Sequence, residues 1–208
     1  MNFDLLLNAF VTLFVTIDPP GLAAVSLGLT VGMNSKQRRQ VALRGTIIGS
    51  IILIAFMMVG APLLSTLGIT MEAFRVAGGL LLFYIAFEMV FEKRQERHEK
   101  SANRAITRDD IHNIAVFPLA IPLIAGPGSI SASILLASEF STPFERITLV
   151  GILLSIALLL YIALALADKI DKLIGDTGRI IATRLLGILL AALSVQYIAD
   201  GVRILAAG

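Results

Sequence analysis

The stretches Asp18-Pro19-Pro20-Gly21 and Gly126-Pro127-Gly128 interrupt two long apolar segments of this 208-residue sequence. Proline lacks a backbone N–H group and clashes with the carbonyl one turn before it, so each stretch predicts a break in a hydrophobic helix. Each break falls in the first apolar segment of its half of the sequence. Paired breaks in corresponding segments are typical of transporters built from two internal repeats, where the breaks form the solute site.

The composition predicts a membrane protein. Hydrophobic residues make up 57% of the sequence and charged residues 15%, whereas soluble domains have about 45–50% apolar and about 25% charged residues. The surplus apolar surface must face a lipid bilayer. The sequence contains no cysteine, which excludes disulfides and thiolate ligands. No cofactor is expected, and the basic residues lie between apolar segments rather than in a patch that would bind nucleic acid.

Six apolar segments are long enough to cross the membrane, since about 20 residues span roughly 30 Å of hydrocarbon. They cover residues 3–31, 41–67, 70–91, 113–138, 147–167 and 180–205. We therefore predict an all-α membrane protein with six transmembrane helices, of which helices 1 and 4 are broken at the Pro-Gly stretches. A polar segment divides the chain into a first three-helix repeat (1–92), a solvated cytoplasmic linker (93–110) and a second repeat (111–208).

The basic residues predict the orientation. In the six-span topology, 14 of the 17 Lys and Arg residues fall on one side, and only Arg75, Arg146 and Arg203 fall on the other. Cytoplasmic loops are enriched in Lys and Arg, so the 14-residue side is cytoplasmic and both termini are periplasmic. In the alternative topology the broken segments are re-entrant and do not cross the membrane. The Lys and Arg residues are then divided more evenly between the two sides, so the alternative accounts for them less well.

The two halves also resemble each other in sequence. Because each half has three spans, the second half runs opposite to the first, and the repeat is predicted to be inverted. The aligned pairs are Pro20-Gly21 with Pro127-Gly128, Arg39 with Arg146, and Arg75 with Arg184.

Four separated motifs carry a resemblance to a known family. They are Ile17-Asp18-Pro19-Pro20-Gly21, the stretch from Pro118 to Ser131, Phe74-Arg75-Val76-Ala77-Gly78-Gly79 and Thr183-Arg184-Leu185-Leu186-Gly187. Over essentially the whole chain they resemble the MarC family of bacterial inner-membrane proteins, which is related to LysE-type exporters. The resemblance implies a multi-pass inner-membrane protein with three plus three spans and no established substrate. Ala24 departs from the family, whose members often carry proline there.

The two breaks are the predicted solute site. Each frees polar backbone groups, which are tolerated at membrane depth only inside protein or beside a wet cavity. The half-helices that begin there present positive N-terminal ends, which suit an anion or a polar solute. The candidate binding residues are Asp18, Pro19, Pro20, Gly21, Gly126, Pro127, Gly128, Ser129 and Gln196.

Asp18 is the candidate for proton coupling, because an ionised carboxylate near the middle of a span is costly unless it is paired or solvated. The alternative is that Asp18 only caps the second half-helix. Its counterpart in the second half is Ala125. Arg75 and Arg184, at the starts of the third and sixth spans, are candidate gates; the alternative is that they extend to the headgroups.

Three functions remain open on the sequence alone. They are a secondary transporter or exporter of a small polar or anionic solute, a passive channel, and a non-transporting membrane scaffold. The sequence has no HExxH, GxSxG or Cys/His cluster, so neither an enzyme nor a metal site is expected. The identity of the solute, the coupling ion and the oligomeric state stay open, with a homo-oligomer as one alternative.

Overall fold

The computed structural model describes residues 3–94 and 114–207, which form helices and connecting turns and no strand. The first half contains α1 (Phe3–Ile17), α2 (Pro19–Leu29), α3 (Ser35–Thr66) and α4 (Met71–Val90). The second half contains η1 (Ala115–Ile124), α7 (Pro127–Glu139), α8 (Pro143–Ala165) and α9 (Ala167–Ala207). Most of the predicted linker, with four of its basic residues, lies outside the described residues.

Five helical segments among these residues are long and apolar enough to cross a membrane. They are α1 with α2, α3, α4, α8 and the part of α9 from Thr177 to Ala207. The pair η1 and α7 is bent by 57° and makes a sixth if it counts as one span. The prediction of an all-helical protein with several membrane spans is therefore confirmed.

Polar caps explain why α3, α4 and α8 begin where they do. At the start of α3, Asn34 Oδ1 accepts a hydrogen bond from the Gln37 amide at 3.0 Å, and Gln37 Oε1 accepts one from the Asn34 amide at 2.9 Å. Thr142 and Glu145 form the same reciprocal pair at α8, and Thr70 caps α4. Such caps satisfy the first amides of a helix. They let α3 and α8 begin earlier than the predicted spans 41–67 and 147–167.

The segment between the predicted spans 147–167 and 180–205 is helical rather than an irregular loop. The chain is helical from Ala167 onwards, with one break at Gly175, whose φ is 63° and ψ is 174°. Glycine adopts a positive φ without steric cost, so it can turn the helix here. The first part of α9 was missed because it carries charged residues such as Asp168 and Lys169, and an apolar window does not detect it.

The fourth apolar segment is less regular than the sequence analysis expected. In addition to the break before α7, η1 contains two extended residues, Phe117 (φ −132°, ψ 120°) and Ile121 (φ −128°, ψ 124°). Each of them precedes a proline, Pro118 or Pro122. The proline ring disfavours helical backbone in the residue before it, so η1 is interrupted at both positions.

The broken segment α1–α2 lies at the centre of the bundle. Of its most apolar stretch 67% is buried, against 28–39% for α3, α4, α8 and α9. The outer helices expose large apolar side chains instead, among them Ile51, Leu158 and Leu185, each about 60% exposed. A surface of this kind suits lipid rather than water.

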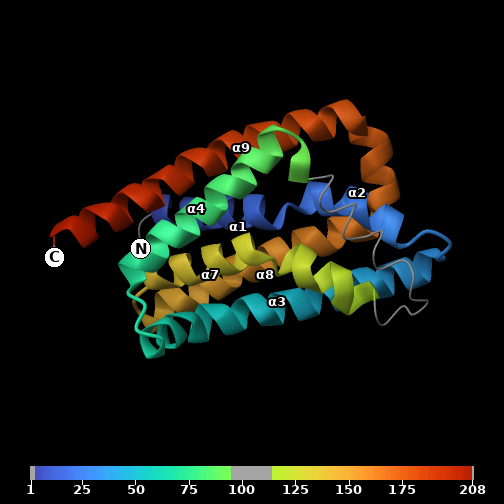
Figure 1. Cartoon of the computed structure of the whole chain (residues 1–208). Helices are drawn as coiled ribbons and strands as arrows, with labels where there is room; N and C mark the ends of the chain where they lie inside the picture. Colours follow the sequence, from blue (N-terminus) through green and yellow to red (C-terminus); the bar gives the residue numbers. More distant parts are fainter. Residues whose placement is uncertain (1–2, 95–113, 208) are drawn as a thin grey trace.

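The two ends of the bundle differ in charge. Both chain termini lie at one end, together with the turns at residues 67–70 and 140–142 (Figure 1). The turn between α2 and α3 and the bent start of α9 lie at the other end. That end carries a group of basic side chains, including Lys36, Arg38 and Lys169. We call it the basic end.

Contacts between the two halves hold the bundle together. Helix α3 packs on η1, α7 and α8, and α8 also packs on α1 and α2. Helix α4 packs on α7, and α9 packs on α2. Helices α4 and α9 lie side by side and share the most extensive contact of all (Figure 1).

Candidate solute site

The first break is built around Asp18, which joins α1 to α2. Asp18 adopts left-handed backbone (φ 59°, ψ 62°), and its Oδ1 accepts a hydrogen bond from the Gly21 amide at 3.1 Å. Pro19 and Pro20 occupy the first turn of α2, where a missing N–H costs nothing. A side chain at position 21 would collide with the Asp18 carboxylate. Asp18 is therefore the N-terminal cap of α2.

The Asp18 carboxylate also has a buried cationic partner. Arg94 Nε lies 3.7 Å from Asp18 Oδ2, and the two side chains are only 5% and 4% exposed. Arg94 also donates hydrogen bonds to the Thr16 carbonyl at 2.5 Å and to Met89 Sδ at 3.1 Å. The sequence analysis placed Arg94 in a solvated linker, and the structure corrects this.

The second break uses a hydroxyl in place of a carboxylate. Ser129 Oγ donates to the Ile124 carbonyl at 2.6 Å and accepts from the Gly126 amide at 3.0 Å. These bonds satisfy two backbone groups that the break frees, and Ser129 is 2% exposed. Gly128 lies against Ile85 of α4. The second break is therefore neutral, whereas the first holds an ion pair.

The role of Ser129 gives a testable prediction. Ser129→Ala leaves the Ile124 carbonyl and the Gly126 amide buried without their partner, and we expect a loss of about 1–3 kcal/mol in the free energy of unfolding. Ser133→Ala is the matched control, since Ser133 Oγ only donates to a carbonyl of its own helix, that of Ser129, at 2.7 Å. Unfolding of both variants in detergent checks this. Equal losses in the two variants would contradict the capping role.

A stripe of polar side chains on α1 runs toward the first break. Asn8, Thr12 and Thr16 are four residues apart and so share one helix face. Thr12 Oγ1 donates to Asn8 Oδ1 at 2.9 Å, and Thr16 Oγ1 donates to the Thr12 carbonyl at 2.7 Å. The Tyr197 hydroxyl of α9 is buried and faces Asn8 and Thr12 of the stripe. The polar face of α1 is therefore continued by a polar group of α9.

The other predicted site residues lie in separate places. Pro20 lines a small pocket of about 70 Å³ against α9. Gln196 donates to both carboxylate oxygens of Asp200 at 3.0 Å and lines an open groove between α1 and α9. Gln196 and Asp200 both belong to α9, so these hydrogen bonds do not join α9 to a neighbouring helix.

The two candidate gate residues lie near opposite ends of α4. Arg75, near the start of α4, interacts electrostatically with Glu139 at the end of α7. Arg184 of α9 forms an ion pair with Glu92, and both side chains are about half exposed. A third cross-half pair, Arg38 with Asp168, lies at the basic end. Its partners are 130 residues apart, and the sequence analysis missed it.

Comparisons with known proteins agree with this architecture. The chain matches the family model described as MarC family integral membrane protein over residues 3–206. It is similar to a UPF0056 membrane protein of Methanocaldococcus jannaschii, 38% identical over 193 residues, which covers 93% of this chain and 84% of that protein. It is also similar to UPF0056 membrane proteins of Archaeoglobus fulgidus (36%, covering 93% and 90%) and Aquifex aeolicus (34%, covering 96% and 92%). No solved structure matches the chain.

Proposed function

Because the chain belongs to the MarC family of integral membrane proteins, we propose that it is a secondary transporter of a small polar or anionic solute. The solute binds between the broken segments, at residues 18–21 and 126–129. One observation carries the proposal: of two breaks in buried segments, the first holds the Asp18–Arg94 pair and is approached by a stripe of polar side chains on α1. A structural kink alone needs neither the pair nor the stripe.

The proposal includes an inverted repeat of three spans plus three. It equates α1–α2 with η1–α7, α3 with α8, and α4 with α9. Under this exchange the packing of α3 on η1 and α7 becomes that of α8 on α1 and α2, and the packing of α4 on α7 becomes that of α9 on α2. The pairs α3 with α8 and α4 with α9 map onto themselves. This correspondence supports the repeat, although Asp18 has no acidic counterpart at Ala125.

The orientation follows from the charges at the two ends. The basic end is cytoplasmic by the enrichment of Lys and Arg in cytoplasmic loops, so both termini are periplasmic in a bacterial inner membrane. The crossing of all six segments is supported by the bend between η1 and α7, which is 57° rather than a reversal.

The chemistry of transport in this proposal centres on Asp18 and Arg94. An anionic group of the solute competes with the Asp18 carboxylate for the Arg94 guanidinium. A proton taken up by Asp18 weakens its hold on Arg94 and so favours the solute. Rocking of one three-helix half against the other then exposes the site to the opposite side. No step requires a covalent intermediate or a cofactor, and the protein acts as a carrier rather than an enzyme.

Flux into proteoliposomes tests this function. A panel of amino acids, dicarboxylates and inorganic phosphate is offered with and without a pH gradient. We expect saturable uptake of at least one solute that responds to the gradient, and loss of that response in Asp18→Asn, since asparagine keeps the cap but takes up no proton. Glu145→Gln removes a carboxylate at the start of α8 but keeps the capping pair with Thr142; it is the control and keeps the response.

The alternatives give different results in the same experiment. Unsaturable downhill flux without exchange supports a passive channel. No flux of any solute in the panel supports a non-transporting scaffold. Saturable flux that Asp18→Asn leaves fully sensitive to the pH gradient removes Asp18 from the coupling step.

A further inference from the structure

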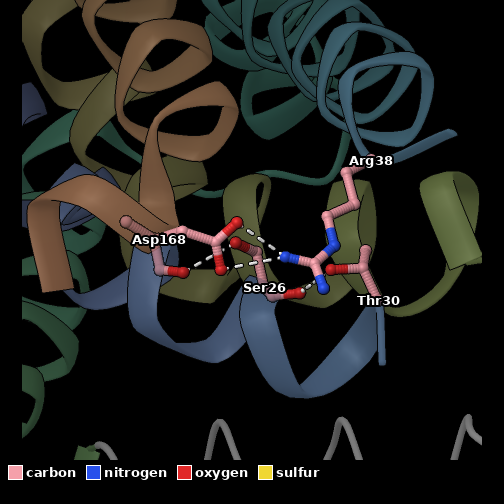
Figure 2. Close-up of polar contacts among 5 residues, drawn as sticks. Ser26, Thr30, Arg38 and Asp168 are labelled. Atoms are coloured by element: carbon pink, nitrogen blue, oxygen red, sulfur yellow. Dashed lines mark hydrogen bonds and ion pairs between the residues drawn. The ribbon is translucent and has the colours of Figure 1, made fainter. Parts of the chain in front are cut away.

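A separate pocket lies at the basic end, where the two halves of the chain meet. It has a volume of about 180 Å³ and opens to the surface. Its polar lining comes from the end of α2, the start of α3 and the start of α9 and comprises Ser26, Thr30, Ser35, Arg38, Arg39, Asp168 and Lys169. Figure 2 shows the Arg38 guanidinium and the Asp168 carboxylate pointing toward each other beside Ser26 and Thr30.

The charges in this pocket do not balance. Arg38 Nη1 donates to both carboxylate oxygens of Asp168, at 2.8 and 2.9 Å. Asp168 therefore neutralises one of three cations. Among the carboxylates whose side chains the structure describes, none forms an ion pair with Arg39 or Lys169. The lining thus keeps an excess of two positive charges.

Two further observations define what the pocket lacks. Arg38 Nε is buried and has no acceptor among the described residues. A buried guanidinium donor without a partner costs free energy. The hydroxyls of Ser26 and Thr30 already donate to carbonyls of α2, at 2.6 and 2.7 Å. The pocket therefore offers donors mainly from its cations, and the group it lacks is an acceptor with negative charge.

We propose that this pocket binds a small oxyanion, a phosphate or a carboxylate, that contacts Arg38, Arg39 and Lys169. Arginine is suited to such groups because its planar fork matches two oxygens at once. The volume lies below the roughly 300 Å³ at which pockets for drug-sized ligands begin, so the ligand is a small anion or a headgroup rather than a nucleotide. Asp168 acts as the internal counter-ion that the ligand displaces from Arg38.

The site goes beyond the solute path proposed above, because Ser26 lies two turns along α2 from Asp18 and binding here does not depend on transport. The oxyanion has two sources, a free anion in solution or the phosphate of an anionic phospholipid. Both sources present the same kind of oxyanion to Arg38, Arg39 and Lys169, and the choice of probe distinguishes them.

Thermal unfolding of the delipidated full-length protein in non-ionic detergent tests the site. The probes are inorganic phosphate, succinate, short-chain phosphatidylglycerol and, as an uncharged control, short-chain phosphatidylcholine. A probe at ten times its Kd is expected to raise Tm by about 3–6 °C. A rise with phosphate or succinate identifies a free anion, and a rise with phosphatidylglycerol alone identifies a headgroup.

Charge variants sharpen the test because they predict opposite signs. Arg38→Gln and Arg39→Gln should weaken the affinity for the active probe by about tenfold or more, whereas Asp168→Asn should strengthen it by about tenfold, since it removes the competing carboxylate. Lys93→Gln is the control and should change affinity less than twofold. The proposal is overturned if no charged probe raises Tm, if phosphatidylcholine acts equally well, or if Asp168→Asn weakens binding.

Discussion

Replacing Arg94 with alanine is expected to lower the free energy of unfolding by about 3–5 kcal/mol, the usual cost of removing one partner of a buried ion pair. The Asp18 carboxylate is 4% exposed and would lose the guanidinium that lies 3.7 Å away. The Thr16 carbonyl would lose its hydrogen bond from Arg94 as well. Unfolding of the purified protein in detergent measures the loss.

Two further variants show whether the buried charge is the cause. Adding Asp18→Asn to Arg94→Ala removes the uncompensated carboxylate and keeps the cap, so the double variant should recover most of the loss. Lys93→Ala, next in the chain and exposed, should cost less than about 1 kcal/mol. If the double variant is less stable than Arg94→Ala alone, the ion pair does not stabilise the first break.

The second large effect is expected at Gly79, where α4 meets α9. A Cβ atom there would lie 2.7 Å from Ile198 Cγ1 and 3.0 Å from the Ser194 carbonyl oxygen. The backbone of α9 cannot move away from one side chain without separating the two helices. Close approach of backbones at small residues is a common basis of helix packing in membranes. We expect Gly79→Leu to cost about 3 kcal/mol, at the upper end of the usual cost of overpacking.

Gly151 provides the matched control for this prediction. It lies on α8, and a Cβ atom there would meet nothing within 4 Å. Gly151→Leu should therefore change the free energy of unfolding by no more than about 0.5 kcal/mol, and Gly79→Ala should fall between the two leucine variants. Similar stabilities for Gly79→Leu and Gly151→Leu would show that α4 and α9 are not tightly packed.

Much of the fold could be predicted from the sequence because lipid imposes a simple requirement. Long apolar segments correspond to α1–α2, α3, α4, α8 and the apolar part of α9. The charged start of α9 could not be predicted in this way, because its helix does not need to face lipid. The interruptions in η1 could have been found, since Pro118 and Pro122 are visible in the sequence and act on the residues before them.

The candidate site was predicted in part. Asp18 was identified from its position in an apolar segment, and the capping alternative describes its hydrogen bond to the Gly21 amide. Arg94 was missed because it lies 76 positions later, in a segment whose composition is that of a linker. The pair of Arg38 and Asp168 was missed because its partners are 130 residues apart in the sequence, and only the fold brings them together.

The central claim is that the breaks lie on a pathway that solutes reach from both sides of the membrane. The natural sequence contains no cysteine, so Ala125→Cys, at the second break, can be labelled without background. Ala132→Cys, fully buried on α7, is the control. In vesicles of known orientation, we predict that a membrane-impermeant thiosulfonate modifies Cys at position 125 from either side and spares position 132. Modification of position 125 from one side only, or from neither, would contradict the account.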